Sequence, residues 1–174
     1  MIESDIPDKV LIIHNVRSAA NVGSMFRTAD GAGIQEIWLT GYTPSPAKPS
    51  QKYLTKAEKS LAKSALGAEY FVAWRKNPSI GNVITRLRLT GHCIIGLEQD
   101  KQSRPLTSII EENVSFALIV GNEVRGLDRR ILRQCDAIGE LPMYGKKNSL
   151  NVSVACGIAL YALQGIIKKS KKNI

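Results

Sequence analysis

A charged residue inside a small-residue helix is the first sign of chemistry in this sequence. The segment NVRSAANVGSMFRTADGAG, residues 15–33, places Arg27 next to two neighbours with almost no side chain, Gly23 and Ser24. The buried face of this helix is predicted by apolar residues at helical spacing, namely Val22, Met25, Phe26 and Ala29. Arg27 lies off that face, near a helix N-terminus, which suits a phosphate or another anion. A surface ion pair between Arg27 and Asp30 explains the spacing equally well.

A second segment, IVGNEVRGLD at 119–128, follows an apolar run that predicts a strand. Gly121 and Gly126 permit backbone turns that other residues resist, and Glu123 stands between them. One interpretation is a glycine-walled pocket that offers backbone amides and one carboxylate. The alternative is a solvated turn with an ion pair of little energetic value.

The third segment, ELPMYGKKNSLNVSVACGIALYALQ at 140–164, ends in a helix that is apolar almost all round. Ser149 or Asn151 could simply cap this helix. A helix without a polar face must be covered on several sides, either by its own core or by a second copy of the chain.

Short apolar strands alternate with helices in the elements that must position these segments. Strands are predicted at 10–14, 34–40, 70–74, 92–98, 116–121 and 137–142. Helices are predicted from Asn21, as a possible N-cap, to about 33, and at 55–64, 79–89, 127–135 and 151–169. This order predicts an α/β fold, a mostly parallel sheet with helices on both faces, in a single domain over 1–174 with a basic tail from about 168. The unusual segments follow strands, where such sheets bind ligands. No GxGxxG follows the first strand and no GxxxxGK[ST] occurs, which disfavours a dinucleotide site and a P-loop.

The charge distribution indicates an anionic partner. The net charge is +9 over 174 residues with a pI near 9.6, yet residues 1–50 hold four Lys or Arg against five Asp or Glu. The excess lies in the remainder, which favours nucleic acid as a partner, although a solvated surface also fits. No apolar run is long enough to span a bilayer, and the first residues lack the pattern of a secretory signal, so we expect a cytoplasmic protein without membrane contact.

The cysteines and histidines are too sparse for a metal site. Cys93, Cys135 and Cys156 are widely spaced in apolar surroundings and are expected to be buried and reduced. Only His14 and His92 could add imidazole ligands, so no metal is expected.

Taken together, the three segments resemble the motifs of the TrmH branch of the SPOUT superfamily of RNA methyltransferases. NVRSAANVGSMFRTADGAG, LIVGNEVRGLD and LPMYGKKNSLNVSVACGIALY match them in order and spacing, and SLNVSVA is especially similar. The resemblance implies methyl transfer from S-adenosylmethionine (SAM) to a ribose 2′-hydroxyl of tRNA or rRNA. It also implies a stand-alone catalytic domain with a C-terminal trefoil knot, and a homodimer that would cover the last helix. Neither knot nor dimer follows from the periodicity.

The resemblance also assigns roles to residues. The polar and catalytic set is Arg27, Asn21, Glu123, Asn151 and Ser149. The resemblance implies that Arg27 acts on the reacting hydroxyl or an RNA phosphate, at a site near the dimer interface where it could meet the SAM of the neighbouring subunit. The SAM loops comprise 97–98, 121–123, 141–143 and 149–150, and their binding residues are Leu97, Gly121, Leu141, Met143 and Leu150. RNA phosphates would be bound by Arg27, Lys48, Lys146 and Lys147. On this interpretation, Gly23 and Ser24 are small so that RNA reaches Arg27.

Two alternatives stay open. One is a catalytically silent SPOUT-like RNA-binding module, which would have no need for Asn21, Arg27, Glu123 and Asn151 together. The other is a methyltransferase that acts on a base nitrogen, although its branches carry motifs different from NxGxxxRT and SLNVS.

Overall fold

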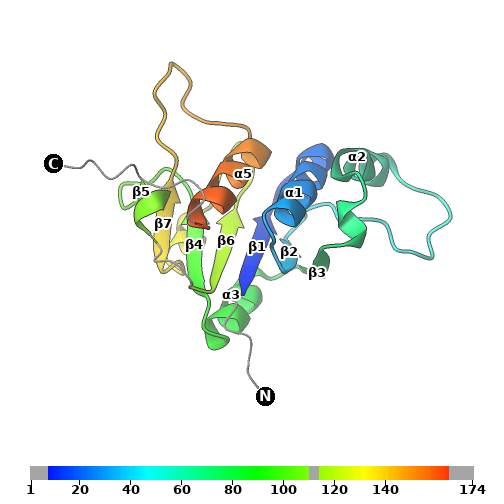
Figure 1. The fold of residues 1–174 in the computed structure, drawn as a ribbon, viewed down its shortest axis with the longest axis horizontal. Helices are drawn as coiled ribbons and strands as arrows, with labels where there is room; N and C mark the ends of the chain where they lie inside the picture. Colours follow the sequence, from blue (N-terminus) through cyan, green and yellow to red (C-terminus); the bar gives the residue numbers. More distant parts are fainter. Residues whose placement is uncertain (1–7, 110–113, 165–174) are drawn as a thin grey trace.

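A computed structural model describes residues 8–109 and 114–164 of the chain. Within them, seven parallel strands form one sheet in the order β3-β2-β1-β6-β4-β7-β5 (Figure 1). The strands are β1 (Lys9–His14), β2 (Glu36–Thr40), β3 (Ala73–Asn77), β4 (Cys93–Leu97), β5 (Arg104–Pro105), β6 (Phe116–Val120) and β7 (Ala137–Glu140). Strands β1 and β6 lie at the centre, and their residues are buried almost throughout, as in a sheet covered on both faces.

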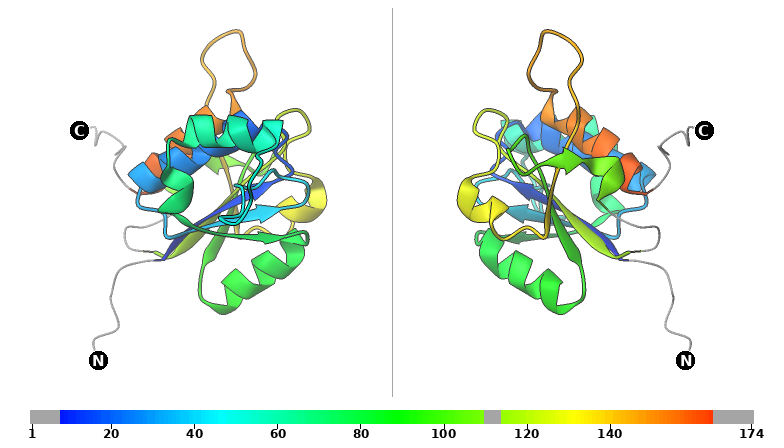
Figure 2. Two further views of the ribbon diagram at one scale, coloured as in Figure 1. Left: turned by 90° about the vertical axis from the view of Figure 1, so that its right-hand side faces the viewer. Right: turned by 90° about the vertical axis from the view of Figure 1, so that its left-hand side faces the viewer.

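Helices cover both faces of the sheet (Figure 2). The helices are α1 (Ala19–Gly31), α2 (Lys56–Ala65), α3 (Ile80–Leu89), α4 (Arg129–Leu132) and α5 (Val152–Leu163), with short 3₁₀ turns at Ala68–Tyr70 and Leu106–Ser108. One hydrophobic core joins the sheet to α1, α2 and α5, and a second joins the opposite face to α3 and α4. The α/β fold with helices on both faces is therefore confirmed, whereas the knot stays a prediction.

Side-chain caps fix where most helices begin. Thr55 and Glu58 form the predicted capping box of α2, and Ser79 caps α3 as expected. Asn151, rather than Ser149, caps α5. Helix α1 begins two residues earlier than predicted, because the hydroxyl of Ser18 accepts the backbone N–H of Asn21 at 3.2 Å. The Asn21 carboxamide is therefore available for another contact.

The strand predicted at 70–74 lies three residues further along the chain, as β3. Leu66, the C-cap of helix α2, has a left-handed conformation, and the following 3₁₀ turn includes Tyr70. The aromatic side chains that suggested a strand, Tyr70 and Phe71, are exposed there. Residues 165–169 of the predicted last helix and the basic tail lie outside the described residues.

Gly23 is small for a reason different from the predicted one. It lies on the side of α1 that packs against α2, where an added Cβ would collide with the carbonyl oxygen of Leu61 and the hydroxyl of Ser64. Gly23 is buried, so it does not open a path to Arg27. The missing side chain brings two helices close together, and only Ser24 is a partly exposed small neighbour of Arg27.

Helix α5 is covered by its own chain on one side only. Ala159 and Leu160 are fully buried in the core, whereas Val154 is 50% and Ile158 38% exposed. The core thus accounts for part of the apolar surface of α5, and these two side chains mark what remains. No described helix is long and apolar enough to cross a membrane.

Candidate functional site

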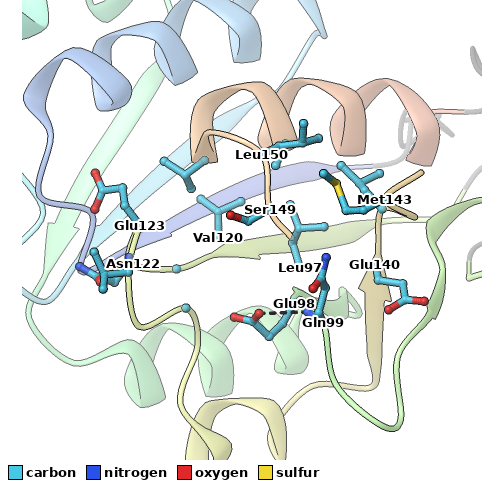
Figure 3. A pocket seen from close by; sticks show the side chains of 16 residues that line it. Leu97, Glu98, Gln99, Val120, Asn122, Glu123, Glu140, Met143, Ser149 and Leu150 are labelled. Carbon is cyan, nitrogen blue, oxygen red and sulfur yellow. Dashed lines mark hydrogen bonds between the residues drawn. The ribbon is translucent and has the colours of Figure 1, made fainter. Parts of the chain in front are cut away.

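A pocket of about 220 Å³ opens at the carboxyl ends of β4, β6 and β7 (Figure 3). Its lining comes from the loops after these strands and from the start of α5: Leu97, Glu98, Gln99, Val120, Gly121, Asn122, Glu123, Val124, Gly126, Glu140, Leu141, Met143, Ser149, Leu150, Val152 and Ala155. We call it the acidic pocket, because Glu98, Glu123 and Glu140 contribute carboxylates while no Lys or Arg occurs among these lining residues. In a chain of net charge +9, this local excess of negative charge favours a cationic ligand.

Glu98 holds one wall of the acidic pocket in place. Its carboxylate accepts the backbone N–H of Leu127 at 2.8 Å and that of Gln99 at 3.0 Å. Gly126, at a φ of +64°, lies directly against this carboxylate, and a Cβ at that position would overlap it. The loop from Gly121 to Gly126 is therefore fixed by a carboxylate at its far end.

A chain of hydrogen bonds joins all three sequence segments beside the pocket. The Asn151 amide donates to the Asn21 Oδ1 at 3.2 Å, and the Asn21 amide donates to a Glu123 carboxylate oxygen at 3.2 Å. The same carboxylate accepts the backbone N–H groups of Arg17 at 3.0 Å and Ser18 at 2.9 Å. Glu123 thus satisfies amides at the start of α1, where negative charge is favourable.

These donors set the charge state of Glu123. Partial burial alone would raise its pKa, but the amides of Arg17 and Ser18, its own backbone and the Asn21 side chain outweigh that effect. The pKa of Glu123 is therefore below its ordinary value. A carboxylate that stays ionised and is already hydrogen-bonded is better suited to hold neighbouring groups in place than to accept a proton.

The structure gathers most of the predicted site residues. All residues assigned to SAM line the acidic pocket, namely Leu97, Gly121, Leu141, Met143 and Leu150. Glu123 and Ser149 of the polar set line it as well. Asn21 and Asn151 join it through Glu123. The predicted RNA-binding lysines are exposed and are not among the residues lining this pocket: Lys48, Lys146 and Lys147.

Arg27 lies outside the acidic pocket, on the exposed side of α1. Its guanidinium has no hydrogen bond or ion pair with any residue that the structure describes, Asp30 included. The surface ion pair considered from the sequence is thus absent in the described part of the chain. An unpaired guanidinium is available to an external anion.

Sequence reasoning missed two polar residues that line the pocket, Gln99 and Glu140, whereas Asn122 lies within the predicted 121–123 loop, where no role was assigned to it. Glu140 is the last residue of β7, where its carboxylate accepts the Ser103 hydroxyl at 2.6 Å. Gln99 donates to the backbone carbonyl of Asn148 at 3.0 Å and so ties the loop after β4 to the loop before α5. The position of Gln99 directly after the strand predicted at 92–98 was the available signal, whereas Glu140 lies inside the strand predicted at 137–142 and gave none.

Neither metal binding nor thiol chemistry has a basis among the described residues. No three His, Cys, Asp or Glu of that part come together as metal ligands would. Burial raises the pKa of Cys135 and Cys156 to about 12 and also raises that of Cys93. All three cysteines are free thiols, and their raised pKa disfavours thiolate formation.

Known proteins share this fold and this sequence pattern. The fold matches an AdoMet-bound rRNA methyltransferase from Sinorhizobium meliloti with a TM-score of 0.80 at 23% identity, over 93% of this chain and 57% of that one. It also matches the TrmH/SpoU tRNA modifying enzyme of A. aeolicus with a TM-score of 0.74 at 25% identity, over 90% of this chain and 74% of that one. The architecture is therefore that of the SpoU and TrmH methyltransferases.

The sequence profile of the SpoU rRNA Methylase family matches residues 8–161, and the chain belongs to that family. A curated relative, the 23S rRNA (guanosine(2553)-2′-O)-methyltransferase RlmP of Bacillus subtilis, is 34% identical over 90% of this chain and 58% of its own length. An uncharacterized tRNA/rRNA methyltransferase of Archaeoglobus fulgidus is 27% identical over 88% of this chain and 63% of its own length. The chain spans 56 to 63% of the length of the first curated relatives that it matches.

Proposed function

We propose that this protein transfers a methyl group from SAM to a ribose 2′-hydroxyl of tRNA or rRNA. One observation carries the proposal: the three segments that resemble the TrmH motifs meet at one site through the Glu123–Asn21–Asn151 hydrogen bonds. Family membership and the name of the RlmP relative support the same reaction. A tRNA or rRNA substrate makes the cytoplasm the compartment that we expect.

The residues of the acidic pocket fit SAM. Leu97, Leu141 and Met143 offer apolar surface for an adenine ring, while the carboxylates suit the positive charges of the sulfonium and ammonium groups. When bound, SAM supplies an electrophilic methyl group on a sulfonium that is already a good leaving group. The protein therefore has to position the ribose hydroxyl and help its proton to leave.

Arg27 is the residue that we assign to the reacting end of the RNA. A guanidinium stays protonated in proteins and is a poor base, so its role would be to bind the adjacent phosphate and stabilise the developing oxyanion. Proton transfer through that phosphate is compatible with this role. Since Arg27 is outside the acidic pocket of its own chain, we place it beside the SAM of a second subunit.

The remaining polar residues would orient these groups. Asn21 and Asn151, already hydrogen-bonded to each other, would hold the ribose, and Glu123 would keep the start of α1 against the pocket. Ser149 faces the pocket and would contact either substrate. The exposed lysines Lys48, Lys146 and Lys147 would follow the RNA backbone as individually weak phosphate contacts.

A homodimer follows from the same proposal. The side chains of α5 left exposed by the core, Val154 and Ile158, would lie in the interface. Replacement of Ala159 by Glu would not test this interface, because it would place a charge in the core of its own chain. Ile158→Glu is the sharper test, with Leu89→Glu as a control at an exposed leucine of α3. Light scattering should report a folded monomer for Ile158→Glu and a dimer for the control Leu89→Glu. An unchanged dimer in Ile158→Glu would exclude this interface.

The reaction is tested by transfer of tritiated methyl from SAM into bulk tRNA and rRNA. Digestion to nucleosides should place the label on 2′-O-methylribose, and calorimetric titration in EDTA should show SAM binding without metal. Label on a base nitrogen would replace the proposal by base methylation. SAM binding without transfer to any RNA, or no SAM binding at all, would argue for a silent RNA-binding module.

A further inference from the structure

A second hollow lies on the other side of the loop that walls the acidic pocket. It is lined by Arg17, Tyr42, Asn122, Val124 and Arg125, and we call it the arginine hollow. Asn122 and Val124 line both cavities, so the two are neighbours. No Asp or Glu is among the described residues that line the arginine hollow, and its two guanidiniums give it a positive charge.

The guanidiniums of Arg17 and Arg125 are free, whereas the backbone N–H of each residue is hydrogen-bonded. The side chains of Arg17 and Arg125 are exposed and form no ion pair or hydrogen bond within the described chain. The backbone N–H of Arg125 donates to Asn122 Oδ1 at 2.8 Å, and that of Arg17 donates to Glu123 at 3.0 Å. The two cations therefore project from fixed positions, ready for anionic oxygens.

Tyr42 is an exposed aromatic ring held at both ends. Its backbone N–H donates to Asn15 Oδ1 at 3.2 Å, and its hydroxyl accepts the Asn122 amide at 3.1 Å. Asn122 is buried and also donates to the Asn15 carbonyl at 3.0 Å. The Tyr42 side chain is nevertheless 58% exposed, and the neighbouring Val124 is 82% exposed. Packing in the core does not explain why the Tyr42 ring is fixed by hydrogen bonds yet exposed to solvent. A flat ligand that stacks on the ring would explain both features.

We infer that the arginine hollow binds an unpaired nucleotide of the RNA substrate next to the methylated one. The base stacks on Tyr42, and the flanking phosphates contact Arg17 and Arg125. Stacking on one ring and phosphate contacts read no base edge, so this subsite selects single-stranded RNA rather than a sequence. The inference rests on the proposed function for the identity of the ligand.

The first experiment measures binding of a fluorescein-labelled oligouridylate by fluorescence anisotropy over a range of salt concentrations. Each phosphate contact to a single strand contributes about 0.7 to the slope of log affinity against log salt, so Arg17→Ala and Arg125→Ala should each reduce the slope by about that amount. Arg133→Ala, at an exposed arginine beside α4, is the matched control and should leave the slope unchanged.

The stacking contact is tested separately. Tyr42→Leu should weaken oligouridylate binding about tenfold without changing the salt slope, because it removes a ring and no charge. Tyr42→Phe keeps the ring and should retain most of the affinity. Phe71→Leu removes an exposed ring far from the hollow in sequence and serves as the aromatic control.

The second experiment links the hollow to methyl transfer. The KM for bulk RNA should rise in Tyr42→Leu and Arg125→Ala, while calorimetry shows SAM affinity equal to that of the wild type. If both variants match their controls in KM, Arg125→Ala also in salt slope and Tyr42→Leu also in oligouridylate affinity, the inference is wrong. If the wild type binds oligouridylate with the expected slopes but methylates no RNA, the proposed function fails and the RNA subsite stands.

Discussion

The two cavities beside the 121–126 loop differ in charge although they share Asn122 and Val124. The acidic pocket has three carboxylates and apolar walls, whereas the arginine hollow has two free guanidiniums and one exposed ring. A cationic methyl donor and a polyanionic acceptor would each meet the opposite charge within one site. The loop, with Glu123 on it, therefore separates two electrostatic environments that a methyl-transfer reaction would have to bring together.

The largest effect is expected at a residue in neither cavity. Arg27→Ala should lower kcat about 100- to 1,000-fold, because it removes a charge-assisted contact made mainly in the transition state. Arg27→Lys should restore little, since an ammonium lacks the bidentate fork. The measurement is tritiated-methyl transfer at saturating RNA.

The controls for Arg27 are SAM titration and thermal melting, both of which should match the wild type because the side chain is exposed and unpaired. Near-normal turnover of Arg27→Ala would make Arg27 a docking contact. The catalytic assignment would then move to Asn21, Glu123 or Asn151.

The next largest effect is expected from a change of charge in the acidic pocket. Glu98→Gln should reduce SAM affinity about tenfold, through the lost attraction for a positive sulfonium. S-adenosylhomocysteine lacks that charge, so its affinity should fall less. Calorimetry of both ligands measures the ratio, and Asp30→Asn, on the exposed side of α1, is the control. An equal loss for both ligands would show that Glu98 acts only by holding the Gln99 and Leu127 amides.

Loss of the hydrogen bond between Asn151 and Asn21, which links two of the three segments, should have a smaller effect than the two changes above, and it should appear in stability. Asn151→Ala removes the N-cap of α5 and the contact to Asn21, at a cost of about 1 kcal/mol. For a domain of this size that corresponds to about 2–4 °C in the melting temperature. Asn151→Asp keeps the cap but not the amide donor, so it should melt like the wild type and still lose turnover. Equal turnover of Asn151→Asp and wild type would limit Asn151 to capping.

The smallest expected effect is a pH dependence of stability caused by His14, which contacts the same Asn15 side chain that holds Tyr42 of the arginine hollow. The Oδ1 of Asn15 accepts the backbone N–H of Tyr42, so the NH₂ group of Asn15 is the one that faces His14 Nε2, at 2.8 Å. An NH₂ group can only donate, which requires His14 Nε2 to be unprotonated. Burial lowers the pKa of His14, although Asp128 partly opposes this.

A folded-state pKa below the unfolded value means that the unfolded chain binds protons first. Stability is therefore full above about pH 6.5 and falls as the pH drops through that value toward the folded pKa of His14. Thermal melting between pH 7.5 and 5.5 should show this loss, and His14→Gln should reduce it. An identical pH dependence in the variant would assign the loss to other groups.

Much of the fold was predictable because apolar runs and caps act locally. The β1 and β6 strands and the capping box of α2 follow directly from residue types that allow few alternatives. The shift of β3 was not predictable, because Tyr70 and Phe71 look like strand residues unless the exposed turn around them is known. The two residues of β5 carry no periodic signal at all.

The site shows the same division between local and long-range information. Leu97 and Met143, which the resemblance assigned to SAM loops, line the acidic pocket, because the position of a motif carries over with the fold. The small size of Gly23 was misinterpreted, because the contact with Leu61 joins helices far apart in the sequence. Tyr42 gave no signal within its proline-rich loop, since its meaning depends on Asn122 eighty residues away.

The central position of β1 has a consequence for synthesis of the chain. Lys9 pairs with Phe116, so β1, which precedes the other six described strands along the chain, cannot obtain its second neighbour until β6 has left the ribosome. At about 5–20 residues per second, β1 waits roughly 5–20 seconds with one open, strongly apolar edge. During that time β1 and β2 form only a partial sheet that other nascent chains could extend. The middle of the sheet is completed late, which makes the newborn protein a natural client for chaperones.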